Sequence, residues 1–337
     1  MTTQPDETNL DTFAEYKNFD KIVGQDRNKR QFKFYIDGYK KTHRMPNLLL
    51  VAPRGSGKNL FTDAIAENLI PKDAQVRKTK LLINSSTIKS VRAFWNSVVI
   101  PYLSDPSKHY TIIFDECHNL SDDVTSMLLT ILNPNKSNEN VYSYDKMNVS
   151  FNFFRHTFFF LTTEGHRVFH ALADRLERIE IGEYTYPDLA KIIGRYLDVG
   201  FDQPSTLEEI SKVVRINPRN AVKMAEKIKS YCIIHDKDEF TIQDWETLKS
   251  DLDIKPYGLT EMELQYLTLL KSRQPVRLGV LASRLSMTPK SLQGDLEVYL
   301  NKLGLIENSP EGRRITNKGY KVIRPKAELV EQSTLQI

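Results

Sequence analysis

The feature that most constrains the fold is an apolar run, a glycine-containing turn and a helical pattern in immediate succession. Leu48–Val51 is wholly apolar, as in a strand buried on both faces of a parallel sheet. Residues 52–59 follow as Ala-Pro-Arg-Gly-Ser-Gly-Lys-Asn, and apolar side chains then recur at helical spacing over residues 60–69. A buried strand joined to a helix by such a turn is typical of a loop that holds phosphate groups.

The turn nearly fits the pattern G-x-x-x-x-G-K-S/T. In that pattern backbone N–H groups surround the phosphates, the lysine reaches the terminal phosphate oxygens and the final hydroxyl holds Mg²⁺. Gly57 and Lys58 fit, whereas Ala52 replaces the first glycine and Asn59 replaces the hydroxyl residue. An amide oxygen can contact Mg²⁺ but differs in reach. We therefore expect ATP and Mg²⁺ to bind here and leave open whether hydrolysis is fast.

Thr111–Phe114 is expected to be another strand, and it ends in Asp115 and Glu116. In ATPases of this type the first acid orients water on Mg²⁺, so Asp115 and Asn59 are the expected metal ligands, Asp115 through water. Glu116 is the expected general base for the attacking water. A simple polar strand end is the alternative. The Asp-Glu-Cys-His run also occurs in superfamily-two helicases, but their Ser-Ala-Thr motif and second RecA-like domain are absent from the sequence, so His118 is expected to be structural.

Three further residues are candidates for sensing or completing the site. Thr163 follows the expected strand Thr157–Leu161, where a polar side chain can bond the attacking water or the γ-phosphate. Arg175 stands where a ring ATPase reaches into its neighbour's site, although a surface salt bridge is the alternative. Arg219 opens a helical stretch within Asn217-Pro218-Arg219 and is a second candidate for contact with the γ-phosphate.

The order of the patterns predicts several domains. Strands alternate with helices as far as Arg178–Ile181, which predicts a mostly parallel sheet covered by helices. Only helical patterns follow, and after Pro256 come three helices and a hairpin, the plan of a winged helix. The expected organisation is a flexible arm over 1–18, a large α/β ATPase domain over 19–182, a small all-α lid domain over 183–255, a winged helix over 256–325 and a tail over 326–337.

Charge and composition narrow the class of partner. The net charge is +4, but residues 271–326 hold 12 Lys and Arg against four Asp and Glu, which suits a DNA backbone. A solvated basic face is the alternative. No apolar run approaches the ~20 residues of a membrane span, and the polar start lacks the pattern of a secretion signal. With two well-separated cysteines, a reduced cytoplasmic compartment is expected, and no membrane partner.

Taken in order, these segments resemble the RuvB family of AAA+ ATPases, the motors of Holliday-junction branch migration, over roughly residues 20–323. Residues 19–25 look like the family's entry segment beside the adenine, 183–189 like the start of its second domain, and 217–219 like its Thr-Pro-Arg sensor. Residues 308–313 resemble its wing. The nucleotide-binding residues that the resemblance implies are Ile22, Val23, Arg54, Gly55, Ser56, Gly57, Lys58, Asn59, Leu60, Tyr184, Pro218 and Arg219.

The resemblance also implies a homo-oligomeric, hexameric ring in which Arg175 completes the adjacent site. DNA would pass through the ring and meet Arg313 and Arg314 on the wing, mainly through its phosphates. The chain departs from the family at three places. Ala173 stands where the family has an additional arginine, and Glu311 replaces the first wing arginine. Residues 133–152, where RuvB carries its RuvA-binding hairpin, are strongly polar, so an ordinary RuvA partner is not expected.

The first function hypothesis is therefore an ATP-driven motor on double-stranded or branched DNA in recombination, repair or replication. The alternative is a nucleotide-gated DNA-binding adaptor or loader subunit, in which Asn59 has weakened hydrolysis. A sequence-specific repressor is a third class. Its recognition helix over residues 291–303 would offer Gln293 and Asn301 among acidic and apolar residues, a poor set for reading the major groove.

Overall fold

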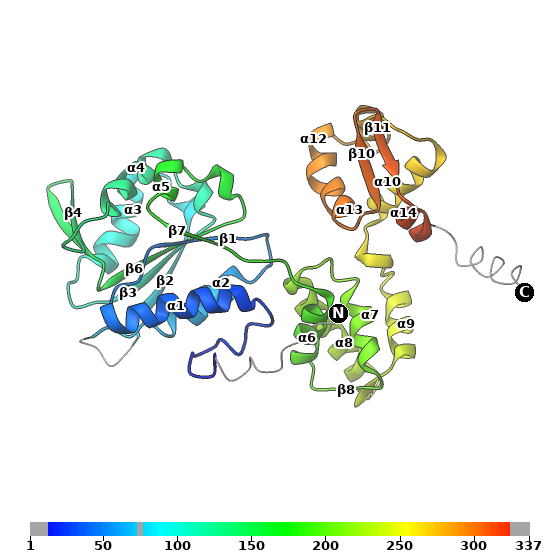
Figure 1. The fold of residues 1–337 in the computed structure, drawn as a ribbon, viewed down its shortest axis with the longest axis horizontal. Helices are drawn as coiled ribbons and strands as arrows, with labels where there is room; N and C mark the ends of the chain where they lie inside the picture. The colour runs from blue at the N-terminus through cyan, green and yellow to red at the C-terminus, as the bar shows by residue number, and fades with distance from the viewer. Residues whose placement is uncertain (1–12, 73–76, 324–337) are drawn as a thin grey trace, which may run out of the picture. The chain divides into compact units, whose positions relative to one another are not determined.

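The computed structural model describes residues 13–72 and 77–323, which form two compact units. The first unit holds the residues up to Asp188 together with Asn217–Arg219. The second holds Leu189–Ile216 and the residues from Asn220 onward. Figure 1 shows the helices and strands of both units.

The first unit is built on a five-stranded parallel sheet with the order β2-β3-β6-β1-β7. Its strands are β1 (Leu48–Val51), β2 (Thr79–Asn84), β3 (Tyr110–Asp115), β6 (His156–Thr162) and β7 (Glu177–Glu180). The α/β prediction is confirmed, and four of these strands were expected. Sequence patterning missed β2 because it is an edge strand, with only Ile83 fully buried among its side chains.

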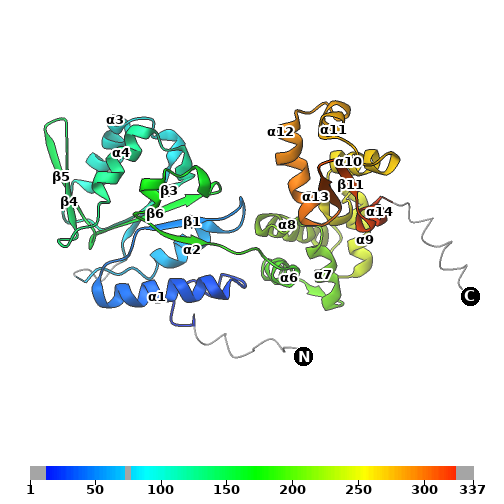
Figure 2. The same cartoon turned by 45° about the horizontal axis from the view of Figure 1, so that its top comes forward.

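Helices cover both faces of this sheet. Figures 1 and 2 show α1 (Asp26–Thr42) and α2 (Lys58–Ala66) on one face, and α3 (Val91–Phe94), α4 (Asp122–Ile131) and α5 (His170–Ala173) on the other. A π-helical segment, Trp95–Leu103, continues α3. Alternate side chains of a strand point to opposite faces, so Phe159 joins the α1–α2 core while Phe158 and Phe160 join the other. Burial on both faces thereby fixes the height of each strand end.

Residues 13–18 belong to this core, which corrects the expectation of a flexible arm over 1–18. Phe13 and Tyr16 are buried beside α1, and the Tyr16 hydroxyl donates a hydrogen bond to Asp37 Oδ1 at 2.6 Å. The polar composition of the segment hid these two aromatic anchors. The rest of the predicted arm, 1–12, and the predicted tail, 326–337, lie outside the described residues.

Strands β4 (Glu139–Tyr144) and β5 (Met147–Asn152) form a β-hairpin, which follows α4 and precedes β6 in the sequence. Tyr142 and Tyr144 pack on Trp95, so this face of the hairpin is anchored to the domain. The opposite face carries the cross-strand pairs Glu139–Asn152, Val141–Ser150 and Ser143–Asn148. Val141, 60% exposed, is the one apolar residue among these six.

The second unit begins with a helical part made of α6 (Tyr186–Arg195, whose first turn groups with the first unit), α7 (Pro204–Ser211), α8 (Pro218–Ile234) and α9 (Ile242–Asp251). Two short parallel strands, β8 (Gly200–Phe201) and β9 (Glu239–Phe240), pair within it. The lid is therefore largely, though not wholly, α-helical. The Thr241 side chain and Asp244 form a capping box that begins α9, a helix that apolar periodicity missed.

The chain then forms a winged helix. Its elements are α10 (Glu261–Ser272), α11 (Leu278–Arg284), α12 (Pro289–Ser291), the π-helical continuation Leu292–Glu297, α13 (Val298–Lys302), β10 (Ile306–Ser309), β11 (Gly312–Ile315) and α14 (Asn317–Val322). Tyr266, Leu281 and Leu300 lie fully buried in its core. Across the described ranges, no helix is long and apolar enough to cross a membrane.

A buried lysine lies beneath the sheet of the first unit. Lys78 is 1% exposed, and its Nζ donates a hydrogen bond to Thr157 Oγ1 at 3.0 Å. Burial lowers the pKa of Lys78 from its ordinary value of 10.5 to about 7. The unfolded chain therefore binds this proton more tightly than the folded chain does, and the charged lysine destabilises the fold.

We predict that Lys78→Met stabilises the first unit at pH 7 by roughly 1–3 kcal/mol, since an apolar side chain has no charge to desolvate. The penalty is full below the folded pKa of about 7 and disappears as the pH rises toward 10.5, so the gain should shrink between pH 7 and pH 9.5. Urea unfolding at both pH values measures it. Lys80→Met, at a partly exposed position, is the control and should change little. A Lys78→Met variant less stable than the unaltered chain at pH 7 would contradict the prediction.

Candidate nucleotide site and DNA-binding surface

The loop between β1 and α2 has the backbone of an anion cradle. Gly55 and Gly57 adopt φ values of 83° and 90°, in the left-handed region that favours glycine. Gly57 begins α2 without a side-chain cap. The first N–H groups of a helix have no acceptor within the helix, so those of α2 remain directed at whatever the loop encloses. The residues present therefore fit the phosphates of a nucleotide.

Lys58 lies inside this cradle. It is 8% exposed, and its Nζ donates hydrogen bonds to the carbonyl oxygens of Ala52 at 2.9 Å and Pro53 at 3.3 Å. Burial lowers the pKa of Lys58, while the negative charges of Glu116 and Asp115 act in the opposite direction. The ammonium group therefore lies beside the loop, bound to neutral carbonyl oxygens. Charged phosphate oxygens form stronger hydrogen bonds with an ammonium and can replace these carbonyls.

The acids and the sensor threonine meet at the carboxyl edge of the sheet. The parallel register pairs Phe114 with Phe160, which brings the ends of β3 and β6 alongside each other. Asp115 Oδ1 accepts a hydrogen bond from the Glu116 N–H at 3.0 Å. Glu116 Oε2 accepts one from Thr163 Oγ1 at 3.1 Å. The structure therefore brings together the predicted base and the predicted sensor.

His118 connects the same two strand ends. Its Nδ1 lies 2.9 Å from Thr162 Oγ1, and its Nε2 lies 3.3 Å from Glu164 Oε1. These two partners flank Thr163 in the chain, so the imidazole fixes the sensor segment on both sides. Sequence analysis expected a structural role for His118 but missed its contacts with Thr162 and Glu164, which depend on the direction of each side chain.

Tyr184 lies against the phosphate loop. Its hydroxyl donates a hydrogen bond to the Ser56 carbonyl at 3.2 Å, and burial raises the pKa of Tyr184 to about 12, so it remains a donor at neutral pH. Ile22 and Val23, expected beside the adenine, are buried in the same unit. The Tyr184 hydroxyl thus contacts the phosphate loop, and its expected contact with the base stays a prediction.

The segment Asn217–Arg219 also contacts the loop. Asn217 Nδ2 donates to the Arg54 carbonyl at 2.9 Å, and the Arg219 N–H donates to the Gly55 carbonyl at 3.3 Å. These bonds occupy loop carbonyl oxygens and leave loop N–H groups for an anion. Pro218 forms the first residue of α8, where its missing N–H costs nothing.

Two predicted residues, Asn59 and Arg175, make hydrogen bonds within their own helical turns. Asn59 is exposed on the first turn of α2, and its backbone carbonyl accepts a hydrogen bond from Thr62 Oγ1 at 2.9 Å. Arg175 is half-buried, and its Nη1 donates to the carbonyl of Ala171, in its own subunit, at 2.7 Å. Asp174, which precedes Arg175 in the chain, pairs with His170 at 3.0 Å.

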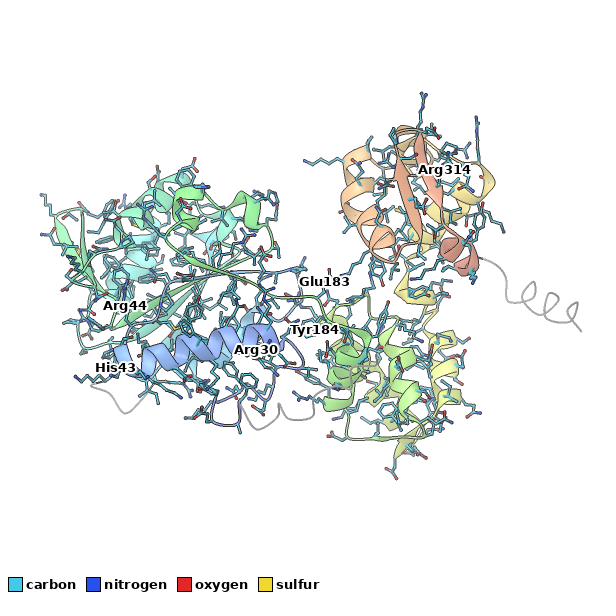
Figure 3. All side chains as sticks on the ribbon, viewed as in Figure 1. Arg30, His43, Arg44, Glu183, Tyr184 and Arg314 are labelled. Atoms are coloured by element: carbon cyan, nitrogen blue, oxygen red, sulfur yellow. The ribbon has the colours of Figure 1, made fainter. Side chains whose placement is uncertain are left out.

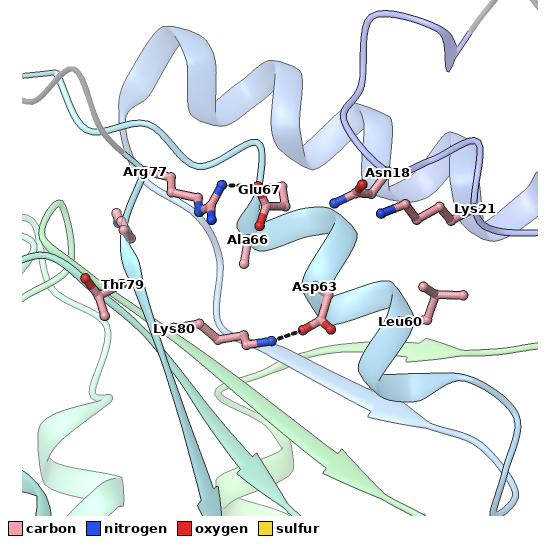
Figure 4. A pocket seen from close by; sticks show the side chains of 10 residues that line it. Asn18, Lys21, Leu60, Asp63, Ala66, Glu67, Arg77, Thr79 and Lys80 are labelled. Atoms are coloured by element: carbon pink, nitrogen blue, oxygen red, sulfur yellow. Dashed lines mark hydrogen bonds and ion pairs between the residues drawn. The ribbon is translucent and has the colours of Figure 1, made fainter.

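A separate hollow of about 640 Å³ lies between α2 and the start of β2 (Figure 4). Leu60, expected at the nucleotide, is among the residues that line this hollow. Its lining includes none of the phosphate-loop residues 52–59. Its charges are largely satisfied by the ion pairs Lys80–Asp63 and Arg77–Glu67, so we assign it no ligand.

The two wing arginines, both expected to contact DNA, have different environments. The Arg313 guanidinium turns inward, where Nε donates to Glu297 Oε1 at 2.8 Å and Nη2 to Oε2 at 3.2 Å. The Tyr266 hydroxyl also donates to Glu297 Oε1. Arg314 faces outward and is half-exposed, with Glu311 as an ion-pair partner (Figure 3). Adjacent strand residues point to opposite faces, so β11 can present only one of them to a ligand.

The sheet order, phosphate loop, paired acids and sensor, followed by a largely helical part and a winged helix, define a P-loop protein of the AAA+ fold. Residues 256–324 match the family model of the RuvB C-terminal winged helix domain. The particular resemblance is therefore to RuvB, and comparison with known proteins extends it over nearly the whole chain.

The Holliday junction branch migration complex subunit RuvB of Campylobacter jejuni subsp. doylei is 23% identical over 329 residues, which cover 95% of this chain and 93% of that protein. RuvB of Mycoplasmopsis pulmonis is 27% identical, covering 90% and 95%. The solved structure of the Thermotoga maritima RuvB Holliday junction branch migration motor gives a TM-score of 0.69 at 22% identity, covering 90% and 95%. The RuvB resemblance expected from the motifs is confirmed, and the chain is a divergent relative.

The same fold serves another class of protein. The Aeropyrum pernix ORC2 protein, solved as ADPNP and ADP complexes, gives a TM-score of 0.54 at 13% identity over 92% of this chain and 94% of that one. The domain architecture alone therefore does not distinguish a motor from other nucleotide-binding proteins.

We predict opposite outcomes for the two wing arginines. Arg313→Ala leaves Glu297 buried without its cation and should destabilise the winged helix by about 3–5 kcal/mol. Arg314→Ala should change stability by less than ~0.5 kcal/mol, yet weaken DNA binding and flatten the salt dependence by about one phosphate contact. Urea unfolding and fluorescence anisotropy with duplex DNA measure the two effects. A stable Arg313→Ala variant, or an Arg314→Ala variant with unchanged affinity at every salt concentration, would contradict them.

Proposed function

We propose that this chain is an ATP-driven motor of the RuvB type that acts on double-stranded or branched DNA in recombination, repair or replication. The observation that carries the proposal is the assembly of Lys58, Asp115, Glu116 and Thr163 at one sheet edge, in a chain whose winged helix matches the RuvB model. The four residues support nucleotide hydrolysis, and the winged-helix match supports DNA as the ligand.

The residues divide the chemistry among them. ATP would supply the phosphoanhydride bond, with Mg²⁺ neutralising its charge. Lys58 would exchange its loop carbonyl partners for phosphate oxygens, and Asp115 would orient water on the metal. Glu116 would accept the proton of the attacking water at a carboxylate oxygen, and Thr163 holds that carboxylate in place. Arg219 would approach the γ-phosphate from the segment that already contacts the loop.

The second candidate function is a nucleotide-gated DNA-binding adaptor or loader subunit. Asn59 favours it, because this exposed amide stands where a hydroxyl would bind Mg²⁺. The fold likeness to the ORC2 protein is compatible with it. Under this hypothesis nucleotide binding changes the conformation of the protein while turnover stays near zero.

The proposed DNA contacts are electrostatic contacts of basic side chains with phosphates. Arg314 is the wing arginine proposed to contact a phosphate, because its ion pair with Glu311 is solvent-exposed, whereas Arg313 is bound to the buried Glu297. Lys290 and Lys302, at the ends of the helical segment that precedes the wing, are also exposed. Backbone contacts of this kind give binding with little sequence preference and a strong salt dependence.

The hairpin of β4 and β5 bears on the protein partner. By the resemblance it stands where RuvB carries its RuvA-binding hairpin, yet the face away from Trp95 offers Val141 among Glu139, Ser143 and their polar cross-strand partners. A stable interface needs an apolar centre that excludes water. We therefore propose that an ordinary RuvA is not the partner and that the hairpin faces a more polar surface.

The experiment that tests the function is steady-state ATP turnover with and without branched DNA. The unaltered chain should turn over ATP, and DNA should increase the rate. Glu116→Gln keeps the shape of the base without its proton affinity, so turnover should fall by ~10²-fold or more while nucleotide binding persists. Lys58→Ala is the matched control and should lose nucleotide binding as well. An unaltered chain that binds ATP with no turnover would contradict the motor and favour the adaptor.

A ring assembly predicts complementation between two inactive variants. Lys58→Ala lacks its own nucleotide site but keeps Arg175, whereas Arg175→Ala keeps its site but lacks the arginine offered to the neighbour. Arginine fingers contribute ~10³–10⁵ in rate, so mixed rings should regain turnover at interfaces that pair an intact site with an intact arginine. The measurement is ATP turnover as a function of mixing ratio. Mixtures that co-assemble and stay inactive would show that Arg175 does not act between subunits.

A further inference from the structure

The turn before α8 has an unusual backbone. Arg215 and Ile216 both adopt left-handed conformations, with φ values of 58° and 52°. Such values are uncommon outside glycine and most unfavourable for a β-branched residue such as isoleucine. A strained turn of this kind persists only where surrounding contacts hold it.

The contacts that hold it come from the winged helix, in the same unit. Arg215 Nη1 and Nη2 donate to Glu263 at 2.7 and 2.9 Å, and Nη1 also donates to the Gly258 carbonyl at 3.1 Å. The guanidinium carbon lies 3.9 Å from the centre of the Tyr299 ring. One side chain of the helical part thus contacts the start of α10 and the helical segment before the wing.

Glu263 is a firm anchor. Its side chain is 1% exposed, and the same carboxylate accepts the Thr260 N–H in the capping box that begins α10. The Arg215 guanidinium and the Thr260 hydrogen bonds hold the pKa of Glu263 below its ordinary value, although burial acts in the opposite direction. The ion pair is therefore present at neutral pH and is well shielded from water.

The residues that follow the turn contact the phosphate loop. Only Ile216 separates Arg215 from Asn217, whose side chain donates to the Arg54 carbonyl. The Arg219 N–H donates to the Gly55 carbonyl two residues later. A displacement of the winged helix would therefore be transmitted through Arg215 and one strained residue to groups that contact the phosphate loop.

We propose that Arg215 is a positioning residue that couples the winged helix to the nucleotide site by fixing the turn that carries Asn217 and Arg219. The proposal rests on the proposed function, since it takes nucleotide and DNA as the two ligands. A planar guanidinium can make a bidentate ion pair and stack on a ring at the same time, and a lysine ammonium cannot. Coupling of this kind is reciprocal, so nucleotide must change DNA affinity by the factor by which DNA changes nucleotide affinity.

The test measures the coupling ratio, defined as the DNA dissociation constant with saturating ADP divided by that with a saturating non-hydrolysable ATP analogue. The unaltered chain should give a ratio that differs from one by about fivefold or more. In Arg215→Ala the ratio should fall to within about twofold of one, and Arg215→Lys should lie between, because it keeps the charge without the bidentate geometry. Fluorescence anisotropy with duplex DNA provides the readout.

Two variants separate coupling from folding. Lys212→Ala removes a nearby surface lysine that pairs with Glu209, and it should keep the full ratio. Glu263→Gln removes the charge of the anchor with little change of shape and should lower the ratio as Arg215→Ala does, so the proposal stays testable if Arg215→Ala fails to fold. Circular dichroism and thermal unfolding establish that each variant is folded.

The outcomes distinguish this proposal from the proposed function. A full ratio in folded Arg215→Ala or Glu263→Gln overturns the coupling role, as does a ratio of one in an unaltered chain that binds both ligands. Absence of ATP turnover contradicts the motor while leaving the ratio measurable. A reduced ratio in both variants with retention in Lys212→Ala supports the proposal.

Discussion

The nucleotide site depends on the burial of β1 at the heart of a parallel sheet. This strand is hydrogen-bonded to β6 on one side and β7 on the other, and its side chains enter two separate cores. Because β1 cannot shift along its neighbouring strands, the phosphate loop that follows it has a fixed position at the carboxyl edge of the sheet. The same register brings Glu116 and Thr163 to that edge, because parallel strands end together at the side where the following loops begin.

Polar contacts then refine what the sheet has placed. Carbonyl oxygens of the phosphate loop accept hydrogen bonds from Lys58, Tyr184, Asn217 and Arg219, and the Ser56 N–H donates to a carbonyl within the loop. His118 ties the acidic strand end to residues on both sides of Thr163. The chain thus holds Lys58 and the phosphate loop at the same sheet edge as Glu116 and Thr163, on strand ends whose positions the core fixes.

The second unit shows how charge can serve structure where composition suggests ligand binding. Arg313, in the basic region 271–326, and Arg215, before it, each form a bidentate pair with a buried glutamate, Glu297 and Glu263 respectively. Buried pairs of this type are costly to break, because removal of one partner leaves the other charged and unsolvated. The Arg313–Glu297 pair therefore leaves fewer arginines available to DNA than their number in the sequence suggests. The Arg215–Glu263 pair joins the winged helix to the helices that precede it in the same unit.

The sequence by itself determined the strand–loop–helix unit, the acidic strand end, the winged helix and the RuvB resemblance. These signals are local: apolar runs, helical spacing, glycines at a turn and short motifs are all read within a few residues. It did not reveal the edge strand β2, whose side chains are mostly exposed, or the aromatic anchors Phe13 and Tyr16 in a polar segment. Tertiary structure alone decided the direction of Arg313, the contacts of Leu60 and Tyr184, and the role of Arg215. Each of these depends on which face of an element a residue occupies and on partners tens of residues away, and no local pattern specifies such partners.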